Sequence, residues 1–89
     1  EIMIKRVAVC GGSGSSLIKK AAQGGASVLI TGDISYHDFY CEDGFMVIDI
    51  GHYESEIGSL EILTSILRKK IHTFAVCKSE KNKNPIHYY

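Results

Sequence analysis

The sequence has few cysteines, and their spacing suits neither a disulfide framework nor a zinc site. Cys10, Cys41 and Cys77 are odd in number and far apart, and no CxxC pair occurs. This usage favours a reducing compartment, so we expect a cytoplasmic protein. It also argues against a zinc site built from cysteine.

An excess of charge and a long apolar run are missing as well. Ten Lys and Arg balance ten Asp and Glu, which gives no general attraction to nucleic acid or to a membrane surface. The nearest approach to a basic patch, residues 68–70, falls at a predicted helix C-terminus, where cations are favourable anyway. No apolar segment approaches the ~20 residues of a membrane span. We expect neither a membrane span nor a nucleic-acid partner.

The chain has 89 residues, and we expect a single α/β domain over residues 1–89. A chain of this size buries only roughly 60–65% of its unfolded surface, so its core is marginal unless another segment shares it. The sequence has no signal peptide, lacks an initiating Met and opens almost directly on a predicted strand. We therefore expect a fragment of a longer protein.

The hydrophobic pattern predicts strands that alternate with helices. Strands are expected over residues 3–10, 26–31, 45–50 and 73–77, a helix from about residue 17 to the glycines at 24–25, a short helix or loop over residues 34–41, and the longest helix over residues 53–71. Alternation of this kind implies parallel pairing. The predicted fold class is therefore α/β, with a small, mostly parallel sheet and helices packed on it.

Polar residues follow each of the first three predicted strands. They are Gly11–Ser16, then Gly32, Asp33 and His37, then Gly51, His52 and Glu56. In open α/β sheets the ligand crevice lies beyond the carboxyl ends of the strands. If the three strands are neighbours, at ~4.8 Å spacing, their ends can share one pocket.

His52 and Glu56 are four residues apart at the start of the longest predicted helix. Residues at this spacing lie over one another, so an imidazole and a carboxylate can bind one cation together. Such ligands suit Zn, Fe or Mn better than Ca or Mg, although two ligands are half a site. The alternative remains open that Glu56 faces the helix dipole and that His52 is an ordinary strand-end residue.

Two further segments can be interpreted either as functional or as purely structural. The glycine loop with Gly11, Gly12 and Ser13 can aim backbone N–H groups at an anion, or it is a tight turn with a serine cap. It matches neither the Walker A motif nor GxGxxG. Asp33 and His37 stand four apart after a strand, but Asp33 is also a plausible helix cap and His37 a surface residue.

Taken in order, these motifs resemble the C-terminal portion of the Nif-three-like family, whose members are often labelled GTP cyclohydrolase type-two homologues or dinuclear metal centre proteins. The resemblance rests on residues 7–15, 30–34 with 36–38, 49–56 and 84–86, and it runs over nearly the whole chain.

The resemblance implies a fold of two related α/β lobes around a cavity, assembled into homo-hexamers. It implies two divalent metal ions (Zn, Fe or Mn) in that cavity, with His52 and Glu56 as the ligands from the C-terminal half. An N-terminal half would supply a His-His pair and an Asp, and this chain contains no His-His pair. Asp33, His37, Gly11, Gly12 and Ser13 would then support the ligands or face the substrate.

The family label implies a metal-dependent hydrolase that opens a purine ring, with the glycine loop beside a phosphate-bearing small molecule. Because the ligand set is incomplete, we expect the 89 residues alone to be inactive and to bind metal weakly. Two alternatives remain: a metal- or nucleotide-binding regulatory module without turnover, and an interaction protein.

Overall fold

The computed structural model describes residues 3–89, and the chain divides into two compact units between Glu56 and Ile57. The first unit contains β1 (Val7–Ser13), the short 3₁₀ helix η1 (Ser15–Leu17), α1 (Ile18–Gln23), β2 (Val28–Gly32), the 3₁₀ helix η2 (Tyr36–Phe39), β3 (Met46–Asp49) and α2 (His52–Glu56). The second unit contains α3 (Gly58–Lys70) and the segment that follows it. The expectation of one domain over residues 1–89 stays a prediction.

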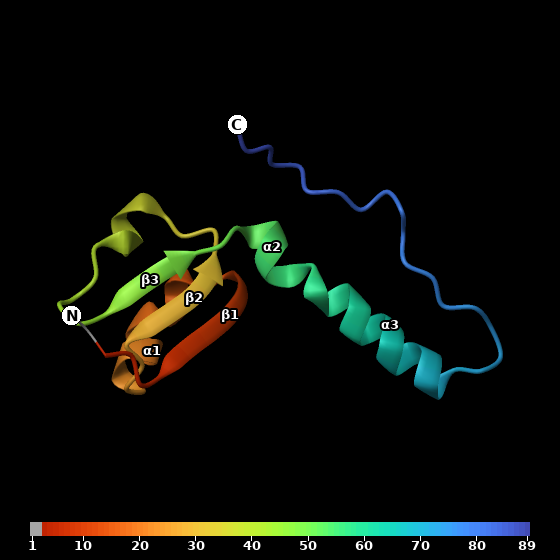
Figure 1. Cartoon of the computed structure of the whole chain (residues 1–89), viewed down its shortest axis with the longest axis horizontal. Helices are drawn as coiled ribbons and strands as arrows, with labels where there is room; N and C mark the ends of the chain where they lie inside the picture. The colour runs from red at the N-terminus through yellow and green to blue at the C-terminus, as the bar shows by residue number, and fades with distance from the viewer. Residues whose placement is uncertain (1–2) are drawn as a thin grey trace. The chain divides into compact units, whose positions relative to one another are not determined.

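The sheet of the first unit has three parallel strands in the order β1-β2-β3 (Figure 1). Val7, Val28 and Met46 lie side by side in register at one end. Parallel strands point their carboxyl ends to one edge, so the turns after β1, β2 and β3 are neighbours. This confirms the predicted α/β class and the assumption that the three strand ends lie together.

The core of the first unit is centred on β2, the middle strand. Both edges of β2 are hydrogen-bonded to a neighbouring strand, which suits its run of β-branched and aliphatic residues. Leu29 is 1% exposed and Thr31 is fully buried. A fully buried hydroxyl requires a hydrogen-bond partner, and the partner of Thr31 lies in the candidate site.

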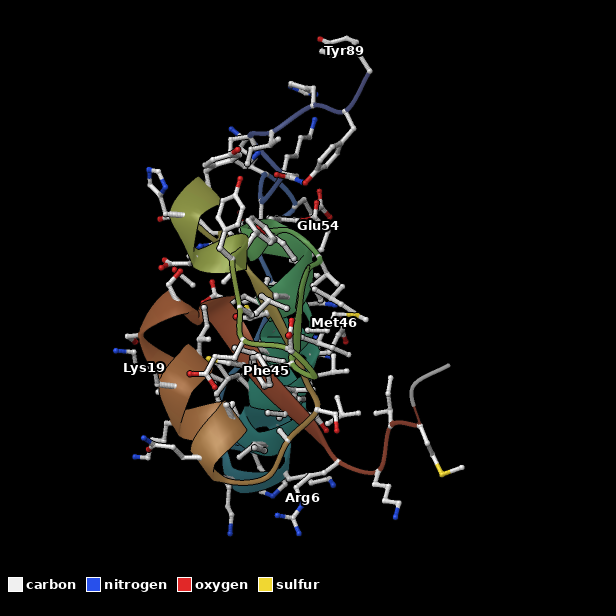
Figure 2. The ribbon with its side chains drawn as sticks, turned by 90° about the vertical axis from the view of Figure 1, so that its left-hand side faces the viewer. Arg6, Lys19, Phe45, Met46, Glu54 and Tyr89 are labelled. Carbon is white, nitrogen blue, oxygen red and sulfur yellow. The ribbon has the colours of Figure 1, made fainter. Side chains whose placement is uncertain are left out.

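Helix α1 packs against one face of the sheet and contacts β2. Figure 2 shows Lys19 of α1 on one side of the sheet and Met46 of β3 on the other. Because side chains alternate along a strand, the face with Met46 also carries Val9 and Ile48. Within residues 3–89 this face is left partly exposed, with Val9 the most exposed of the three at 76%.

The first strand differs from its prediction. It begins at Val7 and continues through Ser13, so Gly11, Gly12 and Ser13 belong to the strand and not to a loop. The register to β2 shifts between Val9 and Ser13, as in a β-bulge. Gly12 sits in that irregular stretch with a φ of +72°, where glycine is the residue that adopts the conformation without strain.

The longest helix is also divided. The predicted helix over residues 53–71 is two helices, α2 and α3, which meet at Ile57 and Gly58. Glycine is a poor helix former, and it stands here as the first residue of α3. The helical pattern therefore placed the segment correctly and missed its interruption.

The predicted fourth strand, residues 73–77, is wrong. The structure has no strand in that segment (Figure 1), and the carbonyl of Val76 accepts hydrogen bonds from the Arg68 side chain at 3.0 and 3.1 Å. A strand exists only where a neighbour satisfies its backbone, and residues 3–89 provide none for this segment. No helix among the described residues has the length and apolar content to span a membrane.

Candidate metal centre

The candidate site is built at the turn from β3 into α2. Gly51 has a φ of +93°, which lets the chain leave β3 and enter α2 at once. The helix begins at His52, so His52 and Glu56 are one turn apart on the same side of α2. The Nε2 atom of His52 lies 3.3 Å from Oε2 of Glu56.

Asp33 brings a second carboxylate to the same imidazole. Its Oδ2 atom lies 3.3 Å from Nδ1 of His52, on the ring nitrogen opposite to the one near Glu56. Asp33 is the one described residue other than glycine with a positive φ, +54°. Asp tolerates this left-handed conformation better than most residues. The unusual backbone of Asp33 thus coincides with its contact to His52.

The three side chains of this cluster are half exposed, at 69% for Asp33, 44% for His52 and 52% for Glu56. Exposed ion pairs contribute little to stability, typically about 0–1 kcal/mol. The cluster therefore contributes little to the stability of the fold. Its exposure leaves the three side chains accessible to an ion from solvent.

The glycine segment of β1 forms a wall of the cluster. A Cβ atom added to Gly12 would fall on Oε1 of Glu56 and lie 3.3 Å from Nε2 of His52. A Cβ on Gly11 would lie 3.3 Å from the carbonyl oxygen of Ser55. A side chain at Gly12 would displace the Glu56 carboxylate and one at Gly11 would crowd the Ser55 carbonyl, so both glycines contribute to the site's shape.

Hydrogen bonds tie that wall to the rest of the site. The Gly12 N–H donates to Oγ of Ser55 at 2.7 Å, and the Ser55 hydroxyl donates to the carbonyl of His52 at 2.8 Å. The buried Thr31 hydroxyl donates to the Gly12 carbonyl at 2.7 Å. The Gly12 N–H already has a protein partner, so Gly12 contributes shape to the site and not an N–H donor for an anion.

Ser13 completes the set of β1 residues at the site. Its hydroxyl donates to the backbone carbonyl of Asp33 at 3.0 Å. The structure therefore brings together six of the seven residues predicted from the sequence: Gly11, Gly12, Ser13, Asp33, His52 and Glu56. Their roles toward a metal ion or a substrate stay predictions.

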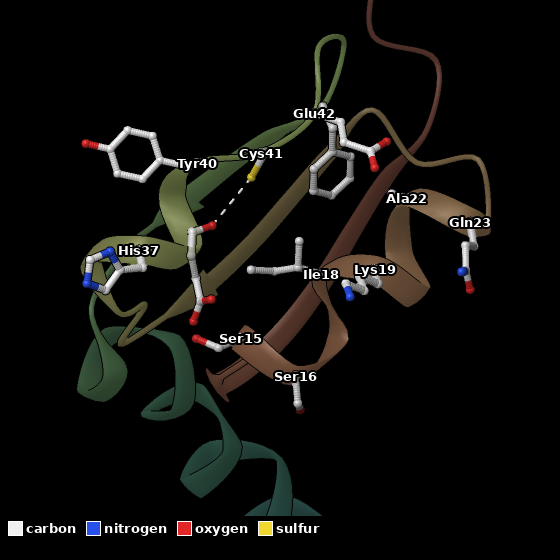
Figure 3. A pocket seen from close by; sticks show the side chains of 12 residues that line it. Ser15, Ser16, Ile18, Lys19, Ala22, Gln23, His37, Tyr40, Cys41 and Glu42 are labelled. Atoms are coloured by element: carbon white, nitrogen blue, oxygen red, sulfur yellow. Dashed lines mark hydrogen bonds between the residues drawn. The ribbon is translucent and has the colours of Figure 1, made fainter.

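His37 is the seventh residue, and it lies in a different place. It belongs to η2, and its ring packs edge-on against Tyr36 with centroids 5.5 Å apart. Figure 3 shows it at a groove of about 930 Å³ between α1 and the connection from β2 to β3, together with Ser15, Lys19 and Cys41. The structure shows no hydrogen bond or ion pair between His37 and the His52 cluster.

Asp49 is a site residue that the sequence reasoning missed. Its carboxylate accepts hydrogen bonds from the backbone N–H groups of Asp33 (3.1 Å), Ile34 (2.9 Å) and Gly51 (2.8 Å). Burial acts to raise the pKa of the Asp49 carboxyl, but these three hydrogen bonds outweigh it and hold the pKa below its usual value. An Asp placed two residues before a turn glycine is the pattern of an Asx turn, and that pattern was the available signal.

The distance between His52 and Glu56 fits two ligands of one metal ion. Zinc binds nitrogen and oxygen at about 2.0–2.2 Å in tetrahedral geometry, which places two ligand atoms about 3.4 Å apart. The observed separation of Nε2 and Oε2 is 3.3 Å. In residues 3–89 no group of three or more His, Cys, Asp and Glu side chains is arranged to hold a metal ion. An ion here would need further ligands from water or from other residues.

The first unit is therefore a parallel α/β sheet in which the turns after the strands bring a histidine and two carboxylates together. These side chains form a candidate cation site at the carboxyl ends of the strands. The chain matches the model of the Duf34/NIF3 family (NGG1p interacting factor 3) over residues 1–85. The chain belongs to this family, which confirms the resemblance noted from its motifs.

Similar proteins agree with this assignment. A protein of Streptococcus pneumoniae named "GTP cyclohydrolase 1 type 2 homolog" is 40% identical over 91 residues, covering 96% of this chain and 34% of that protein. A protein of the same name from Bacillus subtilis is 37% identical over 92 residues, covering 96% of this chain and 24% of that protein. The chain spans about a third or less of the length of the relatives it matches.

Two solved structures share the fold. The crystal structure of Staphylococcus aureus protein SA1388 matches with a TM-score of 0.73 and 35% identity, covering 97% of this chain and 30% of that one. The crystal structure of a Bacillus cereus protein related to NIF3 matches with a TM-score of 0.70 and 28% identity, covering 97% of this chain and 25% of that one.

Proposed function

We propose that this chain supplies one half of a dinuclear metal centre, and that the complete protein is a metal-dependent hydrolase of the GTP cyclohydrolase type-two homologue group. The observation that carries the proposal is the 3.3 Å separation of His52 Nε2 and Glu56 Oε2. The names of the relatives support the hydrolase part, and the separation supports the metal part.

Each residue of the cluster has a proposed task. His52 would bind the metal through Nε2 and Glu56 through its carboxylate, while Asp33 accepts a hydrogen bond from Nδ1–H of His52. A carboxylate partner of this kind fixes the ring orientation and the tautomer and makes the ligand nitrogen more basic. Gly12 keeps the space in front of both ligands free of side-chain atoms.

The site proposed here is incomplete by itself. Two metal ions would need more ligands than His52 and Glu56 provide, and we propose that they come from an N-terminal half of a longer protein and that the assembly is a homo-oligomer. A bound pair of divalent ions (Zn, Fe or Mn) supplies an activated water and polarises the group under attack. Under this proposal residues 1–89 alone have no hydrolase activity.

The substrate proposal rests on the names of the relatives, which point to a purine nucleotide, a phosphate-bearing small molecule. His37 and Lys19 line the groove of Figure 3 and lie outside the cluster.

A cytoplasmic location is proposed from the three free cysteines.

The metal proposal is tested by elemental analysis of the complete protein, with His52→Ala and Glu56→Gln as variants. His87→Ala and Glu80→Gln are matched controls, because both residues are exposed and lie outside the first unit. The site variants should lose metal and the controls should retain it. Full metal content in both site variants would place the ions elsewhere and refute the proposal.

Hydrolase activity needs a separate assay. Release of a ring-opened product from GTP by the complete protein, lost in His52→Ala and retained in His87→Ala, would support it. Normal metal binding without turnover of any purine nucleotide would instead favour a regulatory metal- or nucleotide-binding module.

A further inference from the structure

We propose that Asp49 is a positioning residue that fixes the orientation and the tautomer of His52 by holding two strand-end turns together. The inference rests on the proposed metal-binding role of His52. Asp49 makes no hydrogen bond to His52 or Glu56. It acts through the backbone N–H groups that it accepts hydrogen bonds from.

The contacts of Asp49 come from two separate segments of the chain. Oδ1 accepts from the N–H groups of Gly51 and Asp33, and Oδ2 accepts from the N–H of Ile34. Gly51 belongs to the turn that starts α2, and Asp33 and Ile34 belong to the turn after β2. A single carboxylate thus joins the element that carries His52 to the element that carries its partner Asp33.

Both residues that share Oδ1 have a positive φ. Asp33 has a φ of +54° and Gly51 a φ of +93°. A left-handed conformation outside glycine is strained and persists only where the surroundings hold it. The hydrogen bond from the Asp33 N–H to Asp49 is a local contact that holds it.

The consequence reaches His52 through the Asp33 side chain. With its backbone fixed, Asp33 places Oδ2 3.3 Å from Nδ1 of His52. A carboxylate at that nitrogen favours the tautomer with the proton on Nδ1 and the lone pair on Nε2. Nε2 is the atom that faces Glu56 at 3.3 Å. The Glu56 carboxylate favours the opposite tautomer, with the proton on Nε2, so the Asp33 contact that Asp49 supports is what favours a free lone pair on Nε2 for a cation.

A purely structural role is the competing explanation, because an Asx turn also ends a strand. The two explanations differ in what they predict for His52. A structural role changes stability and leaves the ring of His52 in its tautomer. A positioning role changes the tautomer and the metal affinity together.

The test compares Asp49→Asn with wild type and with Asp43→Asn in the complete protein. Asn keeps the size of Asp but has one oxygen acceptor in place of two and no charge. Asp43 is an exposed carboxylate in the turn before β3 and serves as the matched control. Three quantities are measured: the Kd for Zn²⁺ by calorimetry, the ring-nitrogen NMR shifts of His52, and amide hydrogen exchange at Asp33, Ile34 and Gly51.

We expect Asp49→Asn to weaken Zn²⁺ binding by at most about 10–100-fold, the usual effect of removing a direct partner of a metal ligand, because Asp49 acts one step further out, through Asp33. We also expect the tautomer population of His52 to shift toward the form with the proton on Nε2, next to Glu56, and faster exchange at the amides released from Asp49. Asp43→Asn should match wild type in all three. Unchanged Zn²⁺ affinity with an unchanged His52 tautomer overturns the inference, even if the variant is less stable.

The outcome remains informative if the proposed function fails. If wild type binds no Zn²⁺, the metal proposal is refuted, and the tautomer and the amide exchange then decide the role of Asp49 alone. A His52 tautomer that shifts in Asp49→Asn and not in Asp43→Asn supports the positioning role without any metal.

Discussion

Gly32 at the end of β2 faces the carbonyl of Gly51 so closely that a Cβ atom on Gly32 would lie 2.5 Å from the Gly51 oxygen and 2.8 Å from Cα of His52. The atoms nearest to this Cβ belong to the backbone of Gly51 and His52, so no side-chain rotation can relieve the clash. The start of α2 is therefore pressed against the end of β2, and the position of His52 depends on the absence of a side chain at Gly32.

The first prediction concerns this contact. Gly32→Ala should lower the free energy of unfolding by about 1–3 kcal/mol, the usual effect of forcing a methyl group into a packed site. Urea unfolding followed by circular dichroism measures it.

The control for this change is Gly58→Ala. A Cβ on Gly58 meets nothing within 4 Å, and the residue lies in α3. Ala is a better helix former than Gly by about 0.8–1 kcal/mol in a helix interior, so this variant should be neutral or more stable. Equal destabilisation by both substitutions would contradict the steric argument.

The second prediction separates the shape of the site from backbone strain. Gly12→Ala places a Cβ on the carboxylate of Glu56 at a residue with a φ of +72°. We expect a loss of about 1–2 kcal/mol in stability from the left-handed backbone. We also expect weaker Zn²⁺ binding by the complete protein, because Glu56 must rotate away.

Gly25→Ala is the matched control, since Gly25 has a φ of +83° and follows α1, where its Cβ would approach the Arg6 side chain. It should lose a similar amount of stability and keep its Zn²⁺ affinity. Calorimetric titration of both variants decides the matter, and equal Zn²⁺ affinities in the two would show that Gly12 does not shape the site.

Much of this site could be predicted from sequence because its signals are local. His52 and Glu56 are one helical turn apart, and Asp33 follows a strand in a parallel sheet, so periodicity and topology bring them to one edge. His37 shows the limit of that reasoning. It also follows β2, but the backbone between Asp33 and η2 turns its side chain toward the groove beside α1.

The segments that could not be predicted depend on contacts between distant parts of the chain. The strand expected over residues 73–77 has the right composition and lacks a neighbouring strand among residues 3–89. The extension of β1 through Gly12 relies on the Thr31 and Ser55 side chains, which are 19 and 43 residues away. No local propensity records such partners.

The third prediction tests one of those distant contacts. Thr31→Val keeps the shape of the side chain, removes the hydroxyl that donates to the Gly12 carbonyl, and leaves that carbonyl without this partner. An unsatisfied buried acceptor costs about 1–3 kcal/mol, so the free energy of unfolding should fall by that amount in chemical denaturation.

Thr64→Val provides the comparison. The Thr64 hydroxyl is also largely buried and donates to the carbonyl of Leu60, four residues earlier in α3. A helical carbonyl also accepts a hydrogen bond from the helix's own N–H four residues later, so the loss should be well under that of Thr31→Val. A loss at Thr64→Val equal to or larger than that at Thr31→Val would contradict the argument that the buried Gly12 carbonyl depends on the Thr31 hydroxyl.

The fourth prediction is a pH dependence that follows from Asp49. The backbone N–H groups of Ile34, Gly51 and Asp33 lower its pKa in the folded state against the opposing effect of burial. A carboxyl whose folded pKa lies below its unfolded value, about 3.9, stabilises the fold above the unfolded pKa. That contribution is lost as the pH falls through the folded pKa, because the unfolded state then binds the proton more readily.

Stability of the wild type should therefore decline from about pH 5 downward, and Asp49→Asn should remove the part of the decline that Asp49 causes. Urea midpoints measured from neutral to acidic pH show this as a shallower slope in the variant. Asp43→Asn, which removes an exposed carboxyl without these three hydrogen bonds, is the comparison variant. Identical slopes for wild type and Asp49→Asn would mean that the three hydrogen bonds do not stabilise the ionised carboxylate.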